Sequence, residues 1–185
     1  MPYLIAYQRQ YREHYWNMLT LDEQYVASGV CMFSRPGMPV RRLGQFRAEL
    51  SAGHPLVAQA NNLVSEHKLN EQALTSVPPG PGCQSVWFKI RDGQRWTMNS
   101  HPALAPLPEP LDQLESAMLG LLAEAAKQPL RSLDFRTALN ARSFRPGQEF
   151  TVRLTLANDG KFNTRFINPA SGAGPVCFFV WLAEQ

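Results

Sequence analysis

The sequence predicts an α+β fold in which a helical N-terminal half packs with an antiparallel, β-sandwich-like C-terminal half. Three observations lead to this prediction. Apolar residues recur at helical spacing early in the chain, residues 78–82 are all proline or glycine, and strict apolar–polar alternation follows them. The interruption divides the chain into a mainly helical region, residues 1–77, and a region of hairpin, helix and antiparallel sheet, residues 83–185. One compact domain containing both regions is an alternative that the length allows.

Several helices are expected in the first region. Four of the five tyrosines are spaced by four residues and predict one core-facing helical stripe, formed by Tyr3, Tyr7, Tyr11 and Tyr15. A capping box at residues 20–23 predicts a short second helix, and apolar spacing predicts a third at residues 40–50. Pro55 fits the first turn of a further helix, whose buried face would include Leu63 and Val64.

A hairpin is expected directly after the interruption. Val86, Phe88 and Ile90 alternate toward one face, and Asp92-Gly93 then predicts a tight type I′ turn. In that register Lys89 would lie opposite Trp96, and Trp87 would lie opposite Met98. Both faces of the ribbon are then partly apolar, which favours a ribbon that is covered on both sides.

One helix and several strands are expected in the remainder of the chain. Apolar spacing predicts a helix over residues 111–125, ended by Pro129, and a strand follows at residues 133–139. Alternation predicts a half-buried strand at residues 150–156, with Phe150, Val152, Leu154 and Leu156 facing inward. The unbroken apolar run at residues 176–182 is typical of a buried central strand.

Residues 144–160 carry the one resemblance to a known type of domain. A Pro-Gly turn leads into an alternating strand that ends at Asn-Asp-Gly. This segment resembles a strand of a bacterial immunoglobulin-like β-sandwich module. The resemblance implies a sandwich in the C-terminal half and implies nothing about function.

The charge distribution favours a protein partner with an acidic surface. The chain has 18 basic and 15 acidic residues, for a net charge of +3, and its strong preference for Arg over Lys suggests a GC-rich bacterial genome. Residues 130–166 have seven basic and three acidic residues, a net charge of +4, and the rest of the chain sums to −1. The basic residues are not dense enough for a nucleic-acid site, and no nucleic-acid-binding module is recognisable.

The sequence also bears on the compartment. No apolar run approaches the roughly 18 residues that a membrane helix needs. The N-terminus lacks a secretory signal, so we expect the chain as given to be cytoplasmic, or periplasmic if a leader has been removed.

The residue types that carry common chemistries are present without the usual spacing. Three cysteines, Cys31, Cys83 and Cys177, form neither a Cys-x-x-Cys pair nor a Cys/His quartet, so neither a metal nor a cofactor is predicted. One disulfide is compatible with the sequence. The alternative function is a Cys/His-type hydrolase that uses Cys83 or Cys31 with His54 or His101 as the base.

The favoured prediction is a non-catalytic bacterial protein-binding module. By analogy of class alone, such small chains include immunity or inhibitor proteins that neutralise a secreted toxin or effector. The expected binding site lies on a sheet strand and the loop after it, where Arg and aromatic side chains have the composition of an interface hot spot. The predicted partner-binding residues are Arg153, Lys161, Phe162, Asn163, Arg165 and Phe166.

Overall fold

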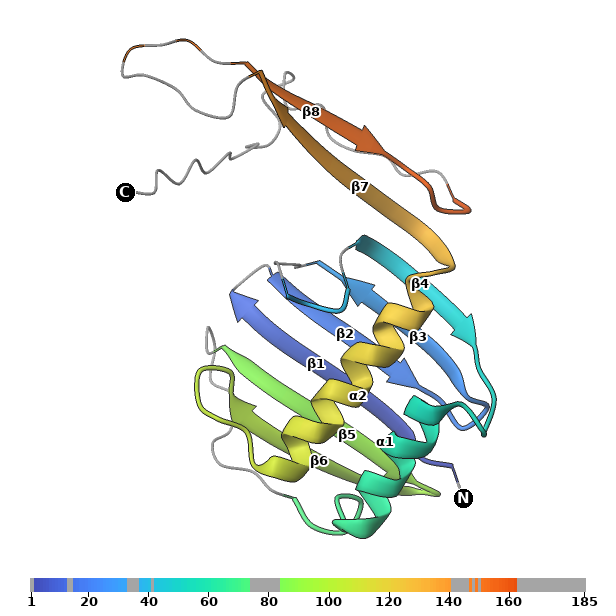
Figure 1. Ribbon diagram of the computed structural model, residues 1–185. Helices are drawn as coiled ribbons and strands as arrows, with labels where there is room; N and C mark the ends of the chain where they lie inside the picture. Colours follow the sequence, from blue (N-terminus) through green and yellow to red (C-terminus); the bar gives the residue numbers. More distant parts are fainter. Residues whose placement is uncertain are drawn as a thin grey trace.

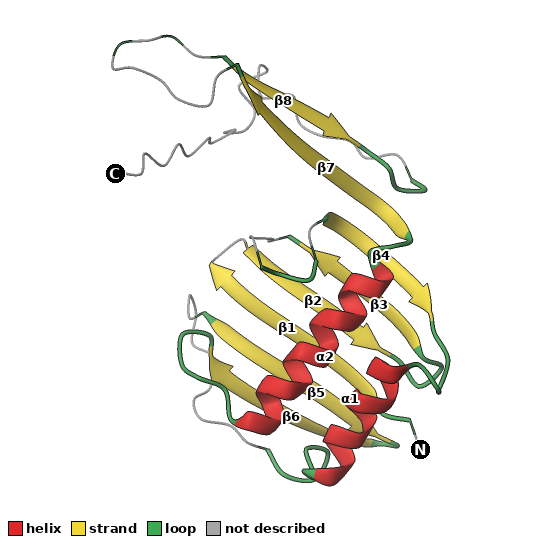
Figure 2. Ribbon diagram, viewed as in Figure 1, coloured by secondary structure: helices red, strands yellow, loops and turns green. Residues whose placement is uncertain are grey.

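In the described part of the chain, eight strands form one antiparallel sheet, and two helices lie on one of its faces (Figures 1 and 2). The computed structural model describes residues 2–12, 15–32, 37–40, 42–73, 84–140, 147, 149 and 151–162. The strands are β1 (Leu4–Arg12), β2 (Tyr15–Leu21), β3 (Val26–Cys31), β4 (Leu43–Glu49), β5 (Ser85–Asp92), β6 (Arg95–Pro102), β7 (Pro129–Leu139) and β8 (Val152–Ala157). The helices are α1 (Pro55–Glu66) and α2 (Glu109–Ala125).

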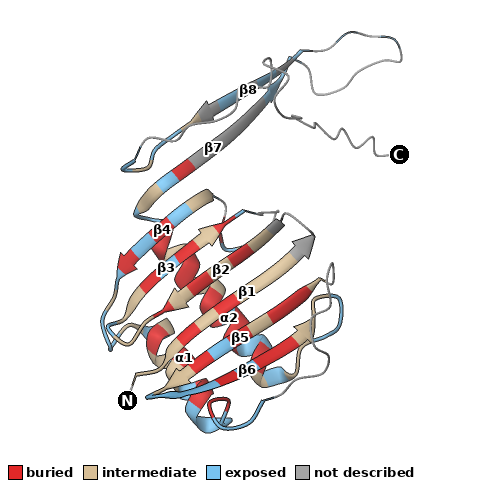
Figure 3. Cartoon of the chain, turned by 180° about the vertical axis from the view of Figure 1, so that it is seen from behind, coloured by how far each residue is buried: buried red, intermediate tan, exposed pale blue. Residues whose placement is uncertain are grey.

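The order of strands in the sheet is β6-β5-β1-β2-β3-β4-β7-β8. A four-stranded meander, β1 to β4, forms the centre of the sheet, the β5–β6 hairpin pairs with β1, and β7 pairs with β4. Strands from before and after residues 78–82 therefore belong to the same sheet. Beyond its pairing with β4, β7 continues with β8 as a two-stranded ribbon that projects past the helices, and we call this ribbon the arm (Figures 1 and 3).

The prediction of a helical N-terminal half is wrong. Tyr7 and Tyr11 of the tyrosine stripe lie in β1 and Tyr15 lies in β2, and Tyr7 is fully buried on the same face of β1 as Ile5. An interval of four residues fits a helix, but it is also an even number, so it places residues on one face of a strand as well. Residues 40–50 contain β4, where Phe46 and Ala48 are buried in alternation with exposed residues.

The expected capping box forms a hairpin turn instead of a helix start. β2 ends at Leu21, and the Oδ1 atom of Asp22 accepts hydrogen bonds from the backbone N–H groups of Gln24, at 2.9 Å, and Val26, at 2.8 Å. Aspartate favours such local turns as strongly as it favours helix caps. Tyr25, with φ of 64°, then leads the chain into β3.

The sandwich-like C-terminal half is also wrong for the described part of the chain. β7 and β8 extend the same sheet as β1–β6, and within the described ranges no second sheet packs on the first. A strand is present where alternation predicted it, as β8, and the side chains of Thr151, Arg153 and Thr155 are exposed as expected. The predicted strand at residues 176–182 lies outside the described residues.

The later helix and hairpin predictions are confirmed in position. α1 begins at Pro55, and α2 buries Leu111, Leu114, Met118, Leu121 and Leu122. The hairpin turn is present, but its register differs by two residues, because Arg91 pairs with Trp96 and Lys89 pairs with Met98. The loop is Gly93-Gln94, with a positive φ of 57° at Gly93 alone, which is typical of a type II′ rather than a type I′ turn.

α2 is fixed on the sheet at two points. Near its start, the buried Glu115 accepts hydrogen bonds from Tyr7 and Arg9 of β1. Near its end, Leu122 packs over Gly29 of β3, where a Cβ atom would come within 2.5 Å of the leucine Cδ1. The absence of a side chain at Gly29 therefore lets α2 lie close to the sheet, and α2 crosses the strands instead of running along them (Figure 1).

Candidate functional site

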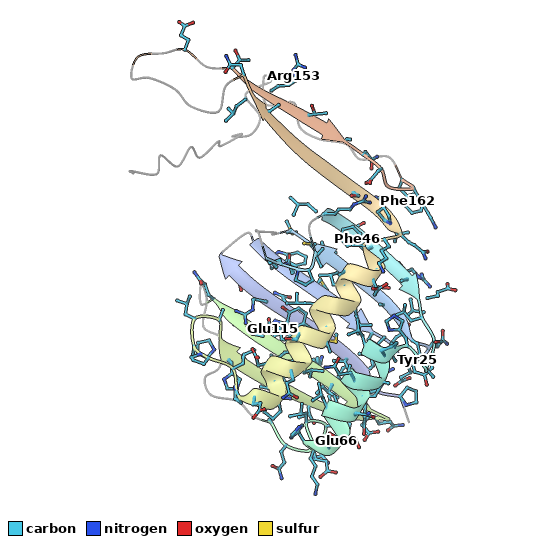
Figure 4. All side chains as sticks on the ribbon, in the orientation of Figure 1. Tyr25, Phe46, Glu66, Glu115, Arg153 and Phe162 are labelled. Atoms are coloured by element: carbon cyan, nitrogen blue, oxygen red, sulfur yellow. The ribbon has the colours of Figure 1, made fainter. Side chains whose placement is uncertain are left out.

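The three predicted partner-binding residues that the structure describes lie along the arm and are not gathered in one place. Arg153 is exposed on β8 and pairs with Ala138, near the outer end of β7. Lys161 and Phe162 lie at the other end, where their backbone N–H groups donate to Pro129 and Leu130 (Figure 4). Phe162 is 54% exposed. The remaining predicted residues, Asn163, Arg165 and Phe166, lie outside the described residues.

The described groups of the Cys/His alternative, Cys31, His54 and His101, lie on separate elements of the fold. Cys31 of β3 is 1% exposed and lies in the hydrophobic core. His54 is the residue before α1, and His101 lies in β6, at the edge of the sheet. Cys83 lies outside the described residues. Within the described ranges, no group of three His, Cys, Asp or Glu side chains could hold a metal ion.

The face of the sheet opposite the helices is the more informative surface. In β1 to β6, alternate described side chains point toward α1 and α2 and are buried, as with Ile5 and Tyr7 of β1 or Val86 and Phe88 of β5. The intervening side chains point to the other face, which no described helix covers (Figure 3). We call this surface the open face.

The open face is rich in large apolar side chains. It carries three of the four tryptophans in the chain, Trp16, Trp87 and Trp96, together with Met18 and Met98. Trp96 is 45% exposed and Met98 is 44% exposed, whereas the other three side chains are partly buried. The solvent face of an antiparallel sheet is usually polar, so an aromatic and methionine-rich face indicates a binding surface.

The strand register arranges these side chains in rows across the sheet. One row runs from Trp87 through Gln8, Met18 and Val30 to Gln45, and then to Arg131 of β7. The neighbouring row runs from Met98 and Lys89 through Ala6, Thr20 and Ser28 to Arg47. The first row is therefore apolar in its middle, and the second has small side chains between two cations.

Cations lie at both sides of the open face. Lys89 and Arg91 lie on β5, and Arg47 and Arg131 lie on β4 and β7, whereas the described carboxylates beside them are two, Glu49 on β4 and Glu23 before β3. The Nζ atom of Lys89 is 4.4 Å from the centroid of the Trp96 ring, and the guanidinium carbon of Arg91 is 5.4 Å from it. These cation–π contacts place two positive groups against the exposed indole.

Two of these cations also contact nearby carboxylates. Arg91 forms an ion pair with Glu23 at 3.2 Å, and Arg47 lies 4.0 Å from Glu49. Both pairs are partly or largely exposed, so they contribute little to stability. The excess of positive charge on the open face remains.

The sequence indicates this surface through the apolar side chains on both faces of the β5–β6 hairpin. Alternation in the β5–β6 hairpin showed apolar side chains on both faces, and we expected both faces to be covered. The Val86, Phe88 and Ile90 face is buried, whereas Trp96 and Met98 on the other face are exposed. Coverage on both sides is therefore wrong for this hairpin in the described part of the chain.

Comparison with protein-family models and with curated proteins finds no match to this chain. Neither α1 nor α2, the helices of the described part, is long and apolar enough to cross a membrane.

Proposed function

We propose that this chain is a non-catalytic protein-binding module that receives an acidic protein partner on the open face. The single observation that carries the proposal is the presence of exposed Trp96 and Met98 beside Lys89 and Arg91 on a sheet face that no described helix covers. Trp, Met and Arg are enriched in protein interfaces, and interface hot spots favour Trp and Arg.

The charge on the open face selects the kind of partner. Four cations against two carboxylates, Glu23 and Glu49, leave a net positive charge that would repel a second copy of the same face, so self-association through it is disfavoured. A surface with carboxylates around an apolar centre is complementary in both respects. An immunity or inhibitor role fits this proposal, because such a protein acts by occupying a surface of its target.

Single-stranded nucleic acid is the competing ligand class, because aromatic and basic side chains on a sheet also suit stacked bases. The positive groups here are few and lie on separate strands, with Gln8, Met18 and Val30 between them. A strand of phosphates requires a more continuous basic track. The protein partner is therefore favoured.

The proposal is tested with three charge-reversal variants that change the net charge equally. The open-face variant is Arg47→Glu with Lys89→Glu, and the arm variant is Arg153→Glu with Lys161→Glu. The control on the helix side is Lys68→Glu with Lys127→Glu. All six side chains are exposed. Peptides are selected from a linear display library on the immobilised wild-type protein, and their binding is followed by tryptophan emission and by association kinetics.

We expect selected peptides rich in Asp, Glu and apolar residues. The open-face variant should lower their association rate about tenfold, with weaker salt dependence, while the helix-side variant stays within about twofold. A loss with the arm variant alone would place the site on the predicted loop and overturn the open face. Tighter binding of a thymidine oligonucleotide than of any peptide, or selection of no peptide at all, would overturn the protein-binding function.

A further inference from the structure

α2 shows in which direction a helix packs on this sheet. Glu115 of α2 meets β1, and Leu122 meets β3, two strands further along the sheet. Seven residues of helix span about 10 Å, and two strand spacings are also about 10 Å. The helix therefore runs nearly perpendicular to the strands, and the sheet accommodates a helix in that direction.

The open face offers matching features along the same direction. Lys89 of β5 and Arg47 of β4 belong to one row, separated by Ala6, Thr20 and Ser28 of the three strands between them. Four strand spacings place the two cations about 19 Å apart. The neighbouring row supplies the apolar side chains Trp87, Met18 and Val30.

We infer that the partner presents an amphipathic α-helix that crosses the strands of the open face, with a carboxylate near each end. This inference rests on the proposed function. About 13 residues of helix span 19 Å, and residues 11 or 14 apart lie on the same side of a helix, spanning about 16–21 Å. An apolar stripe between the two carboxylates packs on the row of Trp87, Met18 and Val30. The first carboxylate pairs with Lys89 or Arg91, and the second pairs with Arg47 or Arg131.

An extended acidic segment is the principal alternative shape. A strand added in the plane of the sheet would pair at an edge, β6 or β8, and would not reach β4 and β5 together. The two cationic sides of the open face are separated across the strands, so one straight element has to cross them to reach both. A helix provides that span with its backbone hydrogen bonds satisfied internally.

The test uses synthetic 18-residue peptides held helical by a hydrocarbon staple. Each carries an apolar stripe and two Glu residues spaced by 14, by 11 or by 7 positions, and a matched peptide has a central proline in place of the staple. Binding to the full chain is measured by tryptophan emission and calorimetry. A charge-swap arm combines Arg47→Glu in the protein with Glu→Lys at one end of the peptide, and repeats the swap at the other end.

We expect the stapled peptides with spacings of 11 or 14 to bind at least about tenfold more tightly than the peptide with spacing 7 and the proline peptide. Arg47→Glu should weaken binding, and the swap at only one of the two ends should restore it. Three results would each contradict the inferred helix: the proline peptide binds as tightly as the stapled peptides, affinity does not depend on the Glu spacing, or the charge swap restores binding at either end of the peptide.

The peptide experiments distinguish a failure of the inferred helix from a failure of the proposed function. If linear selected peptides respond to the open-face reversals while no stapled peptide does, the helix is wrong and the protein-binding face stands. If neither kind of peptide responds to those reversals, the open face is not the binding site and both are wrong.

Discussion

Glu115 of α2 and Arg9 of β1 form a two-point ion pair, in which the Nε–Oε1 and Nη2–Oε2 distances are both 2.6 Å. The hydroxyl of Tyr7 donates a third hydrogen bond to Oε1 at 2.7 Å. Both oxygen atoms of this buried carboxylate therefore hold α2 on the sheet. Its geometry is that of a structural contact between two elements.

Removing this carboxylate should destabilise the fold strongly. In Glu115→Ala, Arg9 keeps its bond to the carbonyl of Ala103 but loses its counter-charge beneath α2. We expect the free energy of unfolding to fall by about 3–5 kcal/mol, measured by urea titration. The double variant Arg9→Met with Glu115→Leu should recover most of the loss, because it leaves no buried charge. A loss in the single variant of less than about 1 kcal/mol would contradict the role of the pair.

Truncation of Phe88 should lower stability, whereas truncation of Trp96 should lower peptide binding. Phe88 is 1% exposed and packs 5.4 Å from the ring of Tyr7, so Phe88→Ala should cost about 3–5 kcal/mol of stability. Trp96 is 45% exposed, and Trp96→Ala should cost under about 1 kcal/mol while it weakens binding of the selected peptides. Thermal melts and peptide titrations on both variants check this contrast. If Trp96→Ala destabilised the protein as much as Phe88→Ala, its side chain would have to belong to the core.

Gly93→Val should weaken the β5–β6 hairpin through the backbone alone. A Cβ at Gly93 would meet nothing within 4 Å, but its φ of 57° is one that β-branched residues resist. We expect a loss of about 1–3 kcal/mol. The matched control is Gly53→Val, because Gly53 also has open space around it and no positive φ. The loss should be absent in this control, and equal losses would show that side-chain bulk, not φ, is responsible.

Gly44→Ala should loosen the arm from the rest of the sheet. A Cβ at Gly44 would collide with the backbone carbonyl of Arg131, and its φ of 149° is unfavourable for alanine. We expect amide exchange in β7 to accelerate by at least about tenfold, with little change in β1 and β5, because these strands are far from β7 in the sheet. Uniform acceleration across all strands would instead indicate global destabilisation.

Helices and strands were predictable from the sequence where only one periodicity fitted. α1 and α2 show apolar spacing of three and four residues, which no strand satisfies, and both were predicted. Tyr3, Tyr7 and Tyr11 are four apart, which fits both periods, and the helix was the wrong choice. Local spacing could not decide between them, because the pairing of β1 with β5 joins distant parts of the chain.

The candidate site was only partly predictable for a related reason. The apolar character of Trp96 and Met98 was evident from the sequence. The position of the basic surface was not predictable from the charge distribution along the sequence. Lys89 and Arg47 are far apart in the sequence, and only the strand register brings them into one row. The basic residues after Leu130 are closer in sequence, yet Arg153 and Phe162 lie at opposite ends of the arm (Figure 4).

The position of β1 in the sheet has a consequence for how the chain matures on the ribosome. β1 is made first, and one of its neighbours, β2, follows directly, but the other, β5, begins only at Ser85. At typical synthesis rates of about 5–20 residues per second, the interval is about 4–15 s. During that time β1 is an unpaired edge whose Ile5 and Tyr7 still lack α2 above them. Nascent chains should therefore be most prone to aggregate, and most dependent on ribosome-bound chaperones, before β5 has emerged.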